Sequence, residues 1–157
     1  MFPDFETSSA TQVAHIIQLA VAPIFLLAGI GAFLNVCAGR LARIIDRARN
    51  IEPLLLGARG EEHDRWLGEI RVLDRRMALV SQAIFFSVLA AVLTCLVVFL
   101  LFTGALTNAQ LGTPVALLFM GSMVAIGVGF TIFLFETRLG SRTVRIRTDI
   151  LEHQAEE

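Results

Sequence analysis

The chain contains three long stretches of apolar and small residues that hold no charged side chain. They cover residues 16–39, 77–103 and 113–135. A helix needs roughly 20 residues to cross the hydrocarbon core of a bilayer, and each stretch reaches this length. The pattern therefore predicts an all-α membrane protein with three transmembrane helices.

The segment between the first two stretches, residues 40–76, has apolar residues at helical spacing. From Leu41 to Leu55 they recur every three or four positions while arginines occupy another face, and a second apolar stripe runs from Trp66 to Met77. The residues from Gly57 to Gly60 are typical of a loop that reverses the chain. We expect the first and second transmembrane helices to extend into an antiparallel cytoplasmic helical hairpin. The alternative is that one or both arms lie flat on the inner leaflet.

The distribution of charge predicts the orientation of the chain. All 13 basic residues are arginines; nine lie in residues 40–76 and four between Arg138 and Arg147. Because cytoplasmic segments of membrane proteins are enriched in positive charge, the hairpin and the C-terminus are expected in the cytoplasm and the N-terminus outside. We predict one membrane domain, residues 1–157, with these parts in order: an external N-terminus (1–15), the first span (16–39), the cytoplasmic hairpin (40–76), the second span (77–103), an external connection (104–112), the third span (113–135) and a cytoplasmic tail (136–157), interpreted as a short interfacial helix or a frayed end.

Two amide side chains and several small residues distinguish the first span. Gln18 and Asn35 need a hydrogen-bond partner or water in hydrocarbon, so we predict that they either bond between helices or line an aqueous pore. Pro23 removes a backbone donor and is expected to kink the helix. Gly29 and Gly31 are expected to permit close helix packing nearby.

The third span carries Gly121, Ala125 and Gly129 at successive spacings of four. Small residues at this spacing let the backbones of two membrane helices approach closely. Together with the small residues of the first span, they predict a homo-oligomer.

Charged residues gather where the predicted spans end. Arg40, Arg43 and Arg47 form a basic face with three competing interpretations: contact with anionic lipid headgroups, salt bridges within the hairpin, or an anion-attracting vestibule of a pore. Glu136 and Arg76 both lie at the predicted inner interface, where a salt bridge between them would hold helix ends together.

Several kinds of chemistry are missing from the sequence. The three spans contain no Asp, Glu, His, Lys or Arg, which argues against a proton-coupled transporter or pump. Hydrolase, nucleotide-binding and metal-site motifs are missing, and His15, His63 and His153 are isolated. We therefore expect no enzyme activity, cofactor, metal or nucleic-acid partner. Cys37 and Cys95 lie at different predicted depths, so no disulfide is expected within one subunit.

The runs from Ala22 to Asn35 (APIFLLAGIGAFLN) and from Arg40 to Arg49 (RLARIIDRAR) resemble a bacterial family of small integral membrane proteins filed as a domain of unknown function. The similarity extends over most of the chain. The resemblance implies three helices in a bacterial inner membrane. It supplies no activity and no catalytic or binding residue.

These observations predict a small homo-oligomeric integral membrane protein of the bacterial inner membrane. The leading hypothesis is an ion channel lined by the first span, with Leu27, Ile30 or Leu34 as a hydrophobic constriction. The alternative is a non-conducting scaffold or accessory subunit that binds lipid or a partner protein through the hairpin. A third class, an enzyme acting on lipid, has only the arginines and Glu136 available for chemistry.

Overall fold

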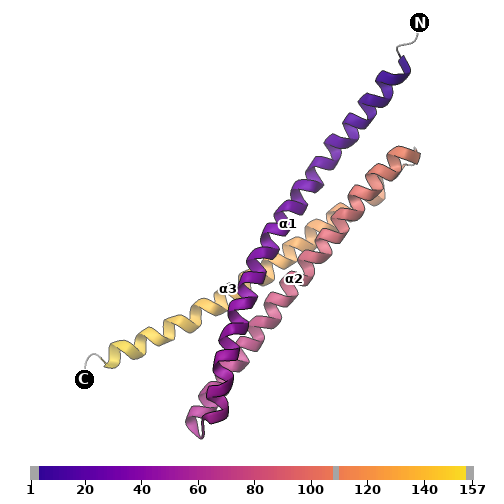
Figure 1. Cartoon of the computed structure of the whole chain (residues 1–157). Helices are drawn as coiled ribbons and strands as arrows, with labels where there is room; N and C mark the ends of the chain where they lie inside the picture. The colour runs from indigo at the N-terminus through magenta and orange to yellow at the C-terminus, as the bar shows by residue number, and fades with distance from the viewer. Residues whose placement is uncertain (1–3, 108–109, 155–157) are drawn as a thin grey trace. The chain divides into compact units, whose positions relative to one another are not determined.

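The structure is a computed structural model that describes the backbone of residues 4–107 and 110–154 and the side chains of residues 14–15, 17–107 and 110–140. Three helices follow one another along the chain: α1 (Asp4–Gly57), α2 (Glu61–Thr107) and α3 (Gly112–Gln154) (Figure 1). Each contains a stretch long and apolar enough to cross a membrane. The predicted all-helical architecture with three membrane-length helices is therefore confirmed.

A short turn separates α1 from α2. The amide of Ala58 donates to the carbonyl of Leu54, and the amide of Asp64 donates to the carbonyl of Gly60, at 3.1 and 3.2 Å. Gly60 has a φ of 63°, a backbone conformation that glycine adopts without the steric penalty of a side chain. Acidic residues then fill the first turn of α2, where they interact favourably with the positive end of the helix dipole. These features explain why the chain reverses between residues 57 and 61.

The helices are longer than the expected spans and extend past their boundaries. α1 begins at Asp4 and continues through Pro23 into the basic segment. α2 ends at Thr107, inside the expected 104–112 connection, so this connection is shorter than predicted. α3 continues to Gln154. The predicted tail is therefore a continuation of the third helix, whereas a short interfacial helix or a frayed end was expected. α1 also passes through Pro53, which lacks only its own amide donor, before the helix ends at Gly57.

Buried positions recur every seven residues along all three helices. A seven-residue repeat keeps the buried side chains of each helix close to one face. The buried residues at this spacing are Pro23, Ile30, Cys37, Ile44 and Ile51 in α1, Leu73, Val80, Ser87 and Thr94 in α2, and Ser122, Gly129 and Glu136 in α3. Polar and charged side chains thus occupy the same series of positions as the apolar core.

Contacts group the chain into two units, each containing parts of all three helices. The first unit comprises Met1–Leu34 and Phe86–Gly127, and the second comprises Asn35–Phe85 and Val128–Glu157. The first unit contains a buried apolar cluster formed by Ile30, Ala90, Ala125 and Ile126. The second unit buries both apolar residues and the carboxylate of Glu136.

Candidate functional site

Glu136 of α3 is completely buried, and two arginines share its carboxylate. Arg40 of α1 donates a hydrogen bond from Nη1 to Oε2 of Glu136. Arg76 of α2 binds Oε1 through Nε at 3.0 Å and Nη2 at 2.9 Å. The exposed fraction of the side chain is 0% for Glu136, 30% for Arg40 and 22% for Arg76. These three residues, called the Arg–Glu–Arg cluster below, join one residue from each helix.

Two features of α3 hold the arginines of this cluster in place. The guanidinium carbon of Arg40 lies 5.3 Å from the centre of the Phe133 ring, within the range of a cation–π interaction. Gly140 lies one turn after Glu136, and a Cβ atom there would stand 3.0 Å from Nη2 of Arg76. The absence of a side chain at Gly140 therefore makes room for the guanidinium of Arg76.

Each residue of the cluster lies directly beside one of the three apolar stretches of the sequence. Arg40 follows the first apolar stretch directly, Arg76 precedes the second directly, and Glu136 follows the third directly. The sequence predicted a bridge between Glu136 and an arginine at the inner interface, with Arg76 as the named partner and Arg40 at the same predicted depth. The structure also pairs Glu136 with Arg40, which the sequence assigned to a basic face with Arg43 and Arg47.

The other two residues of that basic face lie differently. Arg47 donates to Oε1 of Glu69 from Nε at 3.0 Å and from Nη2 at 2.7 Å, which joins α1 to α2. Both side chains are substantially exposed, so this pair contributes little to stability. Arg43 is exposed. The predicted face is therefore divided between an ion pair with buried Glu136, an exposed ion pair and an exposed guanidinium.

A second polar cluster lies in the first unit, between α2 and α3. The hydroxyl oxygens of Thr94 and Ser122 lie 2.6 Å apart, and both contact the carbonyl oxygen of Ala90, at 2.8 and 3.1 Å. Thr94 and Ser122 are both completely buried. In the sequence, Thr94 carried little weight because a hydroxyl side chain can bond to its own helix, and Ser122 was grouped with the small packing residues of the third span. Here they join two helices, so their role is structural.

Of the three small residues predicted to pack in the third span, Gly121 is half-buried and Ala125 and Gly129 are buried. Gly121 leaves space that Leu93 of α2 fills, since a Cβ at Gly121 would lie 3.7 Å from the Leu93 side chain. Ala125 is 7% exposed and belongs to the apolar core, and Gly129 is also buried. These three positions therefore pack against the chain's own helices.

The candidate residues of α1 lie differently from those of α3. Pro23 is buried, whereas Gln18 and Asn35 are exposed. Gly29 and Gly31 are also exposed, and a Cβ at either would meet no atom within 4 Å. The single chain thus leaves these amides and glycines on its surface.

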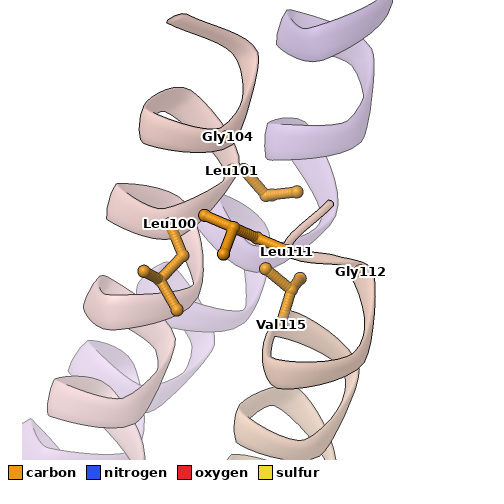
Figure 2. Close-up of a pocket in the computed structure, with 6 residues that line it drawn as sticks. All are labelled: Leu100, Leu101, Gly104, Leu111, Gly112 and Val115. Carbon is orange, nitrogen blue, oxygen red and sulfur yellow. The ribbon is translucent and has the colours of Figure 1, made fainter. Parts of the chain in front are cut away.

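An apolar pocket lies where the end of α2 and the start of α3 meet (Figure 2). Its lining residues are Leu100, Leu101, Gly104, Leu111, Gly112 and Val115. None of them carries a polar or titratable side chain, so the pocket offers no catalytic group. Among the described residues, no group of three His, Cys, Asp or Glu side chains is placed to hold a metal ion. Cys37 and Cys95 are free thiols.

Substituting Gly140 tests how closely the cluster is packed. Alanine stabilises a helix interior relative to glycine by about 1 kcal/mol, and Gly68→Ala should show this gain because nothing lies near its Cβ. Gly140→Ala should lack the gain, since the new methyl group displaces the Arg76 guanidinium from Glu136. Unfolding in mixed micelles measures both variants. An equal stabilisation of the two would show that Arg76 moves without losing its bonds.

Comparison with known protein families gives one match. A family model described as a protein of unknown function, DUF2721, matches residues 20–146. The match covers most of the chain, and the chain therefore belongs to this family. No curated protein and no solved structure matches it significantly.

Proposed function

We propose that this DUF2721 protein is a small homo-oligomeric membrane protein in which α1 lines an ion-conducting path. The observation that carries the proposal is the exposure of Asn35 on α1, beside glycines that have open space around them. In lipid an exposed amide lacks hydrogen-bond partners, and a neighbouring subunit or a column of water supplies them. The exposed Gln18 on the same helix would add a second polar position.

We assign α1 to the subunit interface because its candidate small residues are exposed, whereas those of α3 pack within the chain. Gly121 and Ala125 of α3 already pack inside the chain. A Cβ atom at Gly29 or Gly31 of α1 would meet no atom within 4 Å, and Gly31, one turn before Asn35, remains available for close contact with another helix. Contact between α1 helices of several copies would place Asn35 near a shared axis.

The proposed topology places the basic segments on the cytoplasmic side of a bacterial inner membrane. The pairing of Arg40 and Arg76 with Glu136 supports a location of residues 40–76 and the C-terminal tail on one side. The Arg47–Glu69 ion pair and the buried Ile44 and Leu73 support an antiparallel hairpin formed by α1 and α2. The excess of arginine in both segments favours the cytoplasm.

Ion flux through the reconstituted protein tests the proposal. The natural chain should form oligomers and pass ions in liposomes, and Asn35→Leu should lower this flux by about tenfold or more because a polar ring becomes apolar and loses its water. Gln82→Leu is the matched control, since it removes an exposed amide from α2 and should leave the flux unchanged.

Three outcomes would contradict the channel proposal. A monomer in lipid nanodiscs, measured by native mass spectrometry, would exclude the oligomer. An oligomer that passes no ion under any gradient or membrane tension would identify a scaffold. Equal loss of flux in the Asn35 and Gln82 variants would show that α1 contributes no more to the conducting path than α2 does.

A further inference from the structure

The Arg–Glu–Arg cluster has more positive than negative charge. Glu136 supplies one negative charge to two guanidinium groups. Arg43 and Arg75, called the outer arginines below, lie within one helical turn of a cluster residue and are exposed. Within one turn of the three cluster residues the sequence holds five arginines and two acids, Glu136 and Asp74. The described helices therefore present a local excess of positive charge at this level.

The guanidinium groups of the cluster retain donors that Glu136 does not use. A guanidinium has five N–H groups in a planar arrangement suited to bidentate contact with carboxylate or phosphate oxygens. Arg40 binds Glu136 through Nη1, and Arg76 binds it through Nε and Nη2. Both side chains are partly exposed, so an anion can approach the cluster from its surface.

We propose that the Arg–Glu–Arg cluster and the outer arginines bind the phosphate of an anionic phospholipid headgroup. The position of the cluster favours a lipid over a soluble phosphate, because all three residues directly adjoin an apolar stretch. Val36 and Phe135 lie within one turn of the cluster and are 53% and 58% exposed, so an acyl chain would contact apolar surface next to the headgroup site. A headgroup that has a phosphate but no ammonium group carries net negative charge. It attracts the arginines, and no positive group on the lipid repels them. This inference goes beyond ion conduction and does not depend on it.

Lipid binding by the purified full chain tests this site. Native mass spectrometry should show that phosphatidylglycerol binds in preference to phosphatidylethanolamine. Arg43→Gln combined with Arg75→Gln removes both outer arginines without touching the ion pairs of Glu136, and should weaken phosphatidylglycerol binding by about tenfold or more. Arg49→Gln combined with Arg59→Gln is the control of equal charge; both residues are exposed and lie more than one turn from the cluster, so binding should stay near that of the natural chain.

Three results would overturn the proposal. Equal weakening in both double variants would mean that lipid responds to total charge and not to this site. Equal binding of phosphatidylglycerol and phosphatidylethanolamine would show that the excess of positive charge does not select an anionic lipid. Displacement of phosphatidylglycerol by millimolar inorganic phosphate would identify a free anion as the ligand. Ion flux in liposomes is measured separately, so a failed channel and a failed lipid site give different results.

Discussion

Glu136→Ala should destabilise the folded protein by about 3 kcal/mol, because it leaves two arginines beside a low-dielectric region without their counter-charge. Partial exposure of Arg40 and Arg76 lets water relieve some of this penalty, which places the effect at the lower end of the range for broken buried ion pairs. Unfolding by a denaturing detergent in mixed micelles measures the free energy.

Glu69→Ala provides the matched control for that experiment. It removes a carboxylate from an arginine that is 45% exposed, and the loss should stay below about 1 kcal/mol. A similar loss in both variants would mean that burial of the Glu136 carboxylate has no energetic importance.

Ala90→Leu should destabilise the first unit by about 3 kcal/mol, since a larger side chain cannot fit at a close helix contact without moving the helices apart. Ala90 is completely buried, and its carbonyl oxygen lies 3.1 Å from the Ser122 hydroxyl. Separation of α2 from α3 would therefore also lengthen this hydrogen bond. The same micelle unfolding assay measures the change.

Ala116→Leu introduces the same side chain at an exposed position of α3. It should change the free energy of unfolding by less than about 0.5 kcal/mol. If Ala90→Leu were equally neutral, the contact between α2 and α3 would be looser than the structure indicates.

The number and type of the helices were predictable from the sequence, whereas their packing faces were not. In lipid, a residue that contacts another helix and a residue that contacts an acyl chain meet equally apolar surroundings. Ile30 is 2% exposed and Phe25 is 72% exposed, although both are large apolar residues of the same stretch. The seven-residue repeat of buried positions is therefore hidden wherever every position is apolar.

The polar contacts were predictable only where charge is rare. Glu136 is the sole acid at the end of the third stretch, and its position at the inner interface predicted a bridge with Arg76. Arg40 stood in a run of several arginines, and its partner depends on the rotation of α1, which spacing alone does not determine. The contact between Thr94 and Ser122 depends on the relative rotation of α2 and α3 in the same way.

The order of the cluster residues along the chain has a consequence for biosynthesis. Translation produces Arg40 and Arg76 before Glu136, so an unfinished chain carries these two guanidinium groups at the ends of its first two helices without the carboxylate of Glu136. Only the emergence of the last helix supplies that carboxylate. Final assembly of the three segments is thereby delayed until the ribosome has made the third apolar stretch and Glu136.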